Sequence, residues 1–265
     1  MNVTYLTEHK PAPEHYFPQD SELYFPTWER PCFFQGKDIG TYYNDTDHKH
    51  IVRMHNGSPI SLGVVGKNYK KIDNKELFQG IEQTFIESFT HEQLRNVTVK
   101  DRTSYLGGMC IRQYIFPSIT ADIGSKLSDV AFRSIAINGY DGTSSFKFYN
   151  GAIDFFCENG MVTGTYDMMV KRHTAGLKIP TLLKKVENSI DIFYKQADTW
   201  HKWVGKEITD EDATSCFEAM PNASDKMVQK LMRQFHIECL SHGRTVWALY
   251  SAATFYATHN EGEFK

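Results

Sequence analysis

The pattern of apolar and polar side chains in the middle of the chain, from residue 129 to residue 160, predicts two long strands joined by a turn and then a third strand. Two alternating stretches, residues 130–138 and 143–149, flank the turn-rich sequence NGYDG at residues 138–142. Glycine and asparagine at such positions favour a tight turn between two strands. Neither face of the first stretch is purely polar. We therefore expect both faces of the sheet to be covered, by the chain itself or by another subunit.

Upstream of this hairpin the pattern predicts more strands and one helix. Residues 41–72 alternate around the strong turn dipeptide Asn-Gly at residues 56–57, which predicts a second hairpin. Residues 96–120 predict another strand pair, broken at a Gly-Gly dipeptide. Between these pairs a helix begins, with Asp73 or Asn74 as its N-cap. Its predicted apolar stripe consists of Leu77, Phe78, Ile81, Phe85, Ile86 and Phe89.

Helical periodicity replaces alternation after Pro180. Residues 181–203 predict an amphipathic helix, and Thr209 and Ser224 are N-cap residues of two further helices. The predicted buried positions of the helix after Ser224 are Val228, Leu231, Phe235 and Leu240. A final helix over residues 244–259 has small side chains that allow close packing, at Ala248, Ala252 and Ala253.

These elements predict an α+β fold, with an antiparallel β-sheet core and flanking helices followed by a helical C-terminal region. We expect three parts: a proline- and aromatic-rich arm (residues 1–40), an α+β sheet core (41–180) and a helical C-terminal module (181–265).

The arm is expected to be irregular, because its prolines exclude long helices and central strands. These prolines are Pro11, Pro13, Pro18, Pro26 and Pro31. Seven large aromatic residues lie among them: Tyr16, Phe17, Tyr24, Phe25, Trp28, Phe33 and Phe34. So much apolar surface would not stay in water. The arm is therefore expected to wrap its own domain or to dock on a neighbouring copy of the chain.

Composition indicates an ordered globular protein, since 41% of the residues are hydrophobic and 14% are aromatic. The net charge of −3 argues against a protein that simply coats phosphates. Residues 67–197, however, hold 17 Lys or Arg and 14 Asp or Glu, which gives +3 for the centre of the chain. The five cysteines form no C-x-x-C pair, and no apolar run is long enough to span a membrane. We therefore expect a soluble cytoplasmic protein with reduced cysteines and no membrane association.

The sequence contains none of the common catalytic or nucleotide-binding motifs. His48, His50 and His55 have no carboxylate or cysteine at the spacing of a metal site, and we interpret them as structural or surface residues. Cys157 has apolar neighbours, which is typical of a small core residue. Asp141 lies in a turn that favours aspartate for backbone reasons alone. We therefore predict no catalytic residue, no metal and no cofactor.

Basic residues next to aromatic residues are the remaining signal. Single-stranded nucleic-acid binders use this combination, with cations along the phosphates and rings stacked on the bases. The candidate binding residues are Lys67, Tyr69, Lys70, Lys71, Arg102, Tyr105, Arg112 and Lys147, and the run Lys171-Arg172-His173 repeats the mixture. The alternative is an ordinary solvated surface, on which the same residue types occur together by chance.

Three segments, residues 62–78, 138–161 and 245–260, resemble the phage/plasmid-like protein family, a domain of unknown function found in phages and plasmids. The family pattern includes a DGS-type turn, here Asp141-Gly142-Thr143, and a Cys-x-Asn motif, here at residues 157–159. The resemblance covers roughly residues 50–260 and leaves out the arm. It implies a bacterial host that carries a phage or a plasmid.

The order of elements is also similar to the core of single-strand annealing proteins, the Redβ, RecT and Erf superfamily. This similarity implies a ring or filament that binds single-stranded DNA in a basic groove without nucleotide or metal. The functional hypothesis is therefore single-stranded DNA binding by a homo-oligomer, extending to strand annealing in recombination or replication. A replication or host protein is a further partner expected at the C-terminal helices. One alternative is a non-enzymatic factor that acts on a host or phage protein, and another is an enzyme with an unrecognised site.

Overall fold

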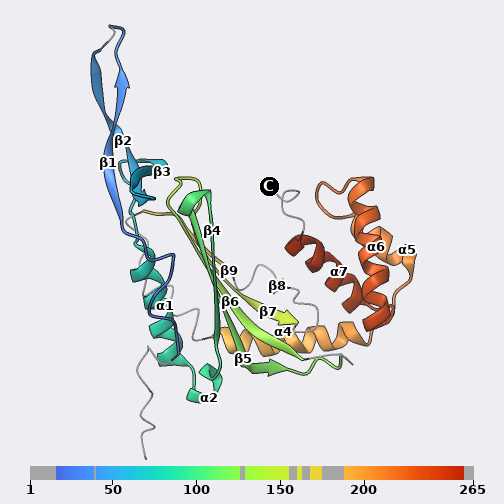
Figure 1. The fold of residues 1–265 in the computed structure, drawn as a ribbon. Helices are drawn as coiled ribbons and strands as arrows, with labels where there is room; N and C mark the ends of the chain where they lie inside the picture. Colours follow the sequence, from blue (N-terminus) through green and yellow to red (C-terminus); the bar gives the residue numbers. More distant parts are fainter. Residues whose placement is uncertain are drawn as a thin grey trace, which may run out of the picture. The chain divides into compact units, whose positions relative to one another are not determined.

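The computed structural model describes residues 16–38, 40–125, 129–154, 160–162, 168–174 and 188–259. The strands are β1 (Thr27–Gln35), β2 (Tyr42–His55), β3 (Ser58–Gly66), β4 (Thr98–Ser104), β5 (Met109–Ala121), β6 (Val130–Gly139), β7 (Phe146–Asp154), β8 (Gly160–Val162) and β9 (Met168–Lys171). The helices are α1 (Asn74–Ser88), α2 (His91–Leu94), α4 (Ser189–Val204), α5 (Asp210–Glu218), α6 (Asp225–His242) and α7 (Val246–His259), with a short 3₁₀ turn at Tyr105–Gly107. Figure 1 shows these elements in chain order.

The strands form two sheets, which confirms the predicted α+β class. The first sheet has the order β1-β2-β3. The second has the order β4-β5-β6-β7-β8, with β9 paired to β7. The chain divides into two compact units, the first comprising residues 1–118, 134–149 and 168–187, and the second residues 119–133, 150–167 and 188–265. Strands β5, β6 and β7 each contribute residues to both units.

The predicted hairpin over residues 41–72 is present as β2 and β3. Asn56 and Gly57 both have positive φ, at 49° and 78°, as a two-residue hairpin turn requires. One part of the arm differs from expectation, because residues 27–35 form strand β1 and are not irregular. Pro31 is tolerated there because β1 is an edge strand and its pairing with β2 shifts register at Pro31/Cys32.

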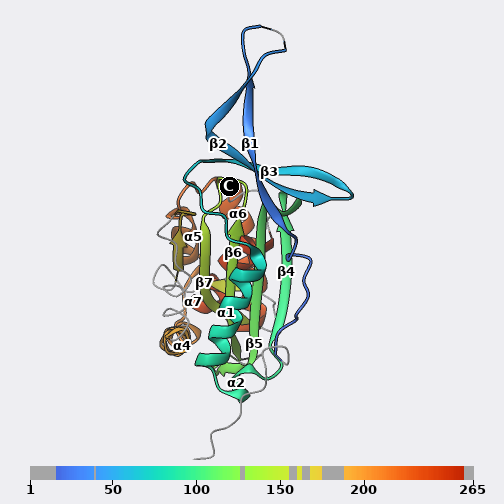
Figure 2. The same cartoon turned by 90° about the vertical axis from the view of Figure 1, so that its left-hand side faces the viewer.

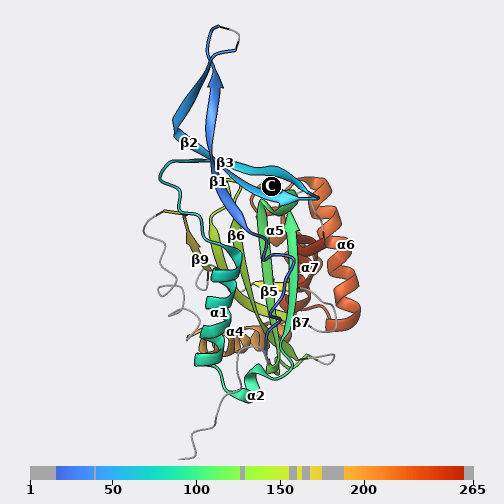
Figure 3. The same cartoon turned by 60° about the vertical axis from the view of Figure 1, so that its left-hand side comes forward.

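The core of the first unit lies between α1 and the second sheet. The predicted apolar stripe of α1 is buried, and its Phe85 ring lies 5.1 Å from Tyr114 and 5.0 Å from Phe116 of β5, measured between ring centroids. Figures 2 and 3 show α1 running along this sheet. Phe17 of the arm is buried against the same two elements, 6.1 Å from Phe85 and 5.8 Å from Tyr114. This part of the arm therefore packs on its own chain.

The end of β1 that is farther from Phe17 along the chain does not pack against α1 and the second sheet. Beyond the end of β3, strands β1 and β2 continue as a two-stranded ribbon, visible in Figure 1 as the long blue hairpin. Its end carries four exposed aromatic residues, Phe33, Phe34, Tyr42 and Tyr43, which we call the aromatic ribbon. Phe34 and Tyr43 are cross-strand partners whose rings stack 5.7 Å apart.

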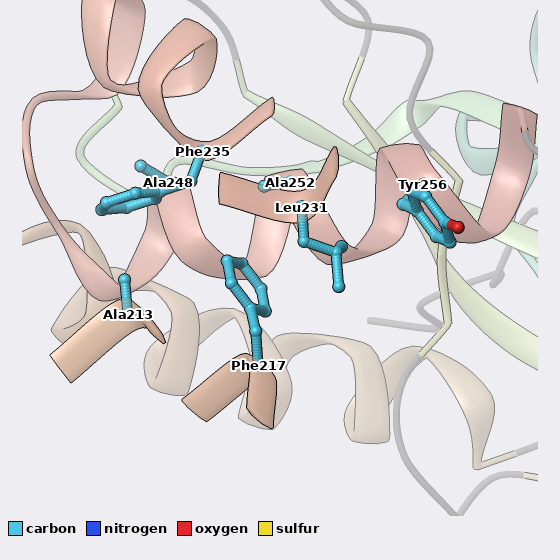
Figure 4. Close-up of a cluster of buried hydrophobic side chains, with 7 residues drawn as sticks. All are labelled: Ala213, Phe217, Leu231, Phe235, Ala248, Ala252 and Tyr256. Carbon is cyan, nitrogen blue, oxygen red and sulfur yellow. The ribbon is translucent and has the colours of Figure 1, made fainter. Parts of the chain in front are cut away.

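The second unit has a helical core in which α5, α6 and α7 meet. Figure 4 shows the seven buried side chains of this cluster, Ala213, Phe217, Leu231, Phe235, Ala248, Ala252 and Tyr256. The small residues of α7 allow the close packing that the sequence predicted. The predicted burial of Leu240 is wrong, because this side chain is 88% exposed. It lies nine positions after Leu231, which is two and a half helical turns, so the two side chains point to opposite faces of α6.

Helix α4 begins at Ser189, within the predicted range 181–203, and residues 181–187 lie outside the described part of the chain. Thr209 caps α5 through a capping box with Asp212, and Ser224 caps α6 by accepting a hydrogen bond from the backbone N–H of Met227 at 3.3 Å. In the described part of the chain, no helix combines the length and the apolar character that a membrane crossing needs.

Candidate nucleic-acid interface

The loop between β3 and α1 carries four of the predicted binding residues. Three backbone hydrogen bonds hold this loop. The N–H of Lys67 donates to Asp47 O at 2.8 Å, the N–H of Tyr69 to Gly66 O at 2.9 Å, and the N–H of Lys70 to His173 O at 2.9 Å. The loop is thus fixed between strand β2 and the residues that follow β9.

Lysines dominate an open pocket of about 670 Å³ beside this loop, which we call the lysine pocket. It is lined by Glu29, Lys49, Lys67, Asn68, Tyr69, Lys70, Lys71 and Thr174. Four of these eight residues are lysines and one is a carboxylate. With the carboxylates of Asp47 and Asp73, which pair with two of the lysines from outside the lining, one positive charge is left in excess. Three of the four lysines are among the candidates predicted from the sequence, and Lys49 is not, because its position depends on the register of β2 with its neighbours.

Three of the four lysines already have carboxylate partners. The Nζ atoms of Lys49, Lys67 and Lys71 lie 2.8 Å from Glu29 Oε1, 2.6 Å from Asp47 Oδ1 and 2.6 Å from Asp73 Oδ1 respectively. Lys71 also donates to the carbonyl oxygen of Thr27 at 2.8 Å, and its side chain is only 18% exposed. Lys71 therefore has a larger structural role than the sequence suggested.

Three exposed cations near the pocket have no carboxylate partner among the described residues: Lys70 in the loop, and Lys171 and Arg172 at the end of β9. Arg172 follows directly on the strand whose Lys171 pairs with Phe146 of β7. Within the described part of the chain, these side chains supply positive charge that no carboxylate neutralises.

Tyr69 packs inside the protein and does not offer a free ring. Its hydroxyl donates to the carbonyl oxygen of Gly139 at 2.5 Å, and its ring stacks on His173 with centroids 4.9 Å apart. Burial, with a smaller effect from Asp141 and Glu29, raises the pKa of Tyr69 well above its usual value. The expectation that this ring stacks on a base therefore needs correction, since His173 occupies one of its faces.

Arg112 is also placed differently from expectation, because it is fully buried between β5 and α1. Its Nε lies 3.0 Å from Glu82 Oε1 and 3.7 Å from Asp101 Oδ1, and its Nη1 donates to the Tyr24 hydroxyl at 2.6 Å. Burial raises the pKa of Glu82 to about 7, although Arg112 acts in the opposite direction. Arg112 is thus the centre of a buried charged cluster and cannot contact a ligand at the surface.

The remaining candidates do not join the lysine pocket. Arg102 is exposed on the edge strand β4, opposite Ile111 of β5. Lys147 is half-buried on β7, opposite Val170 of β9. Two strands separate β4 from β7, so these residues lie at least about 14 Å apart across the sheet. The backbone of Tyr105 forms part of the 3₁₀ turn, and its side chain lies outside the described atoms.

A second open pocket, of about 660 Å³, is lined by residues of the same loop, and we call it the hydroxyl pocket. It is lined by Asp47, Gly66, Lys67, Asn68, Tyr69, Gly142, Thr143, Ser144, Ser145, Arg172, His173 and Thr174. The predicted turn at Asp141-Gly142 forms one wall, and Gly142 has the expected positive φ of 79°. No sequence motif indicated that this turn would meet the residues after β9.

Asp141 has a structural role in this turn. Its carboxylate accepts hydrogen bonds from the N–H groups of Thr143 at 2.9 Å and Ser144 at 2.7 Å, and from the Ser144 hydroxyl at 2.8 Å. Partial burial acts to raise its pKa, but these hydrogen bonds outweigh burial and hold the pKa below its usual value. The carboxylate is therefore ionised and held by its own turn.

The histidines of β2 have local partners, as expected for structural residues. His48 Nδ1 lies 2.8 Å from Asp45 Oδ2, and His50 Nδ1 lies 2.8 Å from Ser61 Oγ. Over the residues that the structure describes, no group of three or more His, Cys, Asp or Glu side chains could hold a metal ion. Cys157, which we interpreted as a core residue, lies outside the described residues.

Comparison with known proteins places the chain in a family. The model of the family described as "Domain of unknown function (DUF932)" matches residues 61–263, and the chain belongs to this family. No curated protein and no solved structure matches the chain. The match covers the loop of the lysine pocket, nearly all of the second unit and the part of the first unit from residue 61 onward, and it leaves out all of β1 and β2. The narrower resemblance to phage/plasmid-like and annealing proteins stays a prediction.

Proposed function

We propose that this member of the DUF932 family binds single-stranded DNA through the lysine pocket and the cations beside it. The observation that carries the proposal is the gathering of four lysines in the described lining of this pocket. Three of them are paired with carboxylates, and Lys70 has no carboxylate partner among the described residues. Cations that track phosphates are the sequence-independent part of nucleic-acid binding. Lys70, Lys171 and Arg172 extend the positive surface with charges that have no carboxylate partner in the described structure.

The existing ion pairs do not prevent such binding. The side chains of Lys67 and Asp47 are 62% and 66% exposed. Exposed ion pairs of this kind contribute only about 0–1 kcal/mol to stability. A DNA phosphate can therefore replace Asp47 as the partner of Lys67 at little cost, whereas Lys71 stays bound to Thr27 and Asp73.

The stacking part of the interface comes, in this proposal, from the aromatic ribbon in place of Tyr69. Tyr43 lies four residues before Asp47 on β2, which is about 13 Å along the strand from the Lys67–Asp47 pair. One single strand of DNA can contact both the aromatic ribbon and the lysine pocket, since each of its nucleotides carries a phosphate and a base. The proposal extends to strand annealing by a ring or filament of this chain.

The test is oligonucleotide binding by fluorescence anisotropy across a salt series, with the full-length chain. We expect the double variant Lys70→Ala/Lys171→Ala to bind more weakly and to lose about 1.4 from the slope of log K against log salt, because single strands give about 0.7 per phosphate contact. Loss of two ribbon rings, in Phe33→Ser/Tyr42→Ser, should cost about 1–3 kcal/mol per stacked base with little change of slope.

The matched control is Lys202→Ala/Lys226→Ala, which removes two exposed lysines from α4 and α6 of the second unit. This control should keep the wild-type affinity and slope. The proposal is wrong if the full-length chain binds no oligonucleotide at low salt, or if Lys70→Ala/Lys171→Ala and the control behave alike.

A second candidate function is protein binding through the aromatic ribbon. Its four rings are 60%, 56%, 65% and 52% exposed for Phe33, Phe34, Tyr42 and Tyr43. Clustered exposed aromatic side chains are typical of protein interfaces. The charged residues of β1 and β2 are mixed in sign around these rings, which suits a protein partner better than a polyanion. This candidate predicts that ring loss leaves the affinity for oligonucleotides unchanged.

A further inference from the structure

His173 is a buried polar residue with an unexplained environment. It is 4% exposed, and neither of its ring nitrogens has a well-formed hydrogen bond to a described residue. Its backbone is fixed by the bond from Lys70, and Tyr69 covers one face of its ring. Buried polar atoms are nearly always hydrogen-bonded, to protein, to water or to a ligand. Because His173 lines the hydroxyl pocket, a bound ligand is one source of the missing partner.

The other polar side chains of the pocket can all donate hydrogen bonds, except Asp47, and the amide and hydroxyl groups among them can also accept. Asn68, Ser145, Arg172 and Thr174 line it, and in the described structure their side chains have no hydrogen-bond partner. Lys67 adds a second cation beside Arg172. Asp141 belongs to the turn that forms one wall of the pocket. Its carboxylate already accepts three hydrogen bonds from its own turn.

The side chains that line the hydroxyl pocket favour an anionic ligand over a metal ion or an apolar molecule. A metal ion would need several carboxylate or imidazole ligands, but among the described lining residues Asp47 is the one carboxylate and it is paired with Lys67. An apolar ligand would leave the donors unpaired. A group with several acceptor oxygens and negative charge satisfies Arg172 and the neutral donors at once, and it can share Lys67 with Asp47. A volume of about 660 Å³ is also within the range of small-molecule sites, roughly 300–1,000 Å³.

We propose that the hydroxyl pocket binds a phosphate monoester, with Arg172 and Lys67 on its charged oxygens and a ring N–H of His173 as a donor. Burial lowers the pKa of His173, so its imidazole is neutral at pH 7 and offers one donor. Two sources present this chemistry, a free nucleoside monophosphate or the 5′-phosphate end of a DNA strand. The second source rests on the proposed function, whereas the pocket itself does not.

The first experiment detects the ligand at His173 by NMR of the histidine ring signals of the full-length chain, assigned with His173→Phe. Titration with thymidine monophosphate should shift the His173 signals in a saturable way, and thymidine should not shift them. Titration with inorganic phosphate alone should give a weaker shift. Absence of any shift of His173 at millimolar thymidine monophosphate overturns the proposal.

The second experiment uses a pair of neighbouring residues as matched variants. Arg172 lines the pocket and Lys171 does not, although both are exposed and both carry one positive charge. Arg172→Gln should weaken binding of thymidine monophosphate at least tenfold, and Lys171→Gln less than twofold. Equal weakening in both variants would reveal general surface attraction and would overturn the proposal. Both substitutions are at the surface, so the test does not depend on whether His173→Phe folds.

A third comparison separates the two sources and separates this inference from the proposed function. Oligonucleotides with a 5′-phosphate should bind more tightly than those with a 5′-hydroxyl, in a manner that Arg172→Gln removes, if strand ends are the ligand. If only thymidine monophosphate shifts His173, the free nucleotide is the ligand. If oligonucleotides do not bind at all but the nucleotide shifts His173, the proposed function fails and this inference stands. If oligonucleotides bind but thymidine monophosphate does not shift the His173 signals, the proposed function stands and this inference fails.

Discussion

At the scale of single residues, burial decides the protonation of His173. Burial lowers its pKa below the usual 6.5, while the Lys70 backbone and Asp141 act weakly in the other direction. The folded state therefore binds fewer protons than the unfolded state. The resulting stability is present above about pH 6.5 and is lost as the pH falls below that value towards the folded pKa.

We therefore expect His173→Phe, which keeps a ring against Tyr69, to reduce the pH dependence of the free energy of unfolding. Denaturant titrations at about pH 7.5 and about pH 5.5 measure it. The wild-type chain should lose more stability on acidification than the variant. The same loss in both proteins would show that His173 is not the group that titrates.

Gly142 gives a second prediction at this scale, because the chain has a matched glycine. Gly142 and Gly57 have φ of 79° and 78°, so alanine is strained equally at both, by about 1–2 kcal/mol. A Cβ at Gly57 would meet nothing within 4 Å, whereas a Cβ at Gly142 would lie 2.6 Å from the carbonyl oxygen of Val64. We expect Gly142→Ala to be less stable than Gly57→Ala by about 1 kcal/mol or more.

Thermal and denaturant unfolding of both variants measure this difference, and equal losses would contradict the close approach of the turn to β3. The positive φ of Gly142 was predictable from the sequence, because the turn residues are contiguous. The contact with Val64 was not predictable, because it depends on how two separate hairpins pack.

The same distinction explains the binding candidates. Lys67 and Lys70 were recognisable as surface cations from their own loop. Arg112 was not recognisable as buried, because its partners Glu82 and Tyr24 are 30 and 88 residues away in the chain. The role of Tyr69 likewise depends on His173, over 100 residues further on.

At the scale of elements, periodicity was a reliable guide wherever one face meets a core. The stripe of α1 and the two hairpins follow directly from it. Strand β1 was missed because Pro31 is a strong signal against a strand, and only its place at the sheet edge and at a register shift makes it acceptable. Leu240 was misplaced because an apolar residue near a helix end was assigned to the buried face without the helical period.

Helix α6 offers a test of that correction. Leu231 is fully buried in the cluster with Phe217 and Phe235, whereas Leu240 is exposed. We expect Leu231→Ala to cost about 2–5 kcal/mol of stability, through lost burial and a residual cavity. Leu240→Ala should stay within about 0.5 kcal/mol of the wild-type value. Chemical denaturation of the two variants measures both, and a large loss in Leu240→Ala would mean that another surface covers it.

At the scale of the whole molecule, the sequence predicted the α+β class but not the division into units. The chain passes between the two units several times, so that each unit consists of three separate segments. Strands β5, β6 and β7 contribute residues to both units. Composition changes along the chain cannot reveal units that are discontinuous in sequence. The predicted three-part division into arm, sheet core and helical module stays a prediction, although β1 and Phe17 connect the arm to the first unit.

Self-association is the prediction that belongs to this scale, and the structure shows how to test it. Deleting residues 1–40 would remove β1 and the buried residues Phe17 and Leu23, and would therefore damage the first unit itself. The exposed rings can instead be replaced in the full-length chain. We expect the wild-type chain to sediment as an oligomer at micromolar concentration, and Phe34→Ser/Tyr43→Ser to lower that oligomeric state.

The matched control is Ile237→Ser/Leu240→Ser, which removes two exposed apolar side chains from α6. Exposed large apolar groups contribute to association only where they are covered by a partner, so the two pairs of substitutions need not act alike. Sedimentation velocity of all three proteins distinguishes the surfaces. A wild-type monomer would exclude the oligomer altogether. A decrease in the α6 variant alone would assign the contact to the second unit, and the exposed rings of the aromatic ribbon would then be available to DNA bases or to another protein.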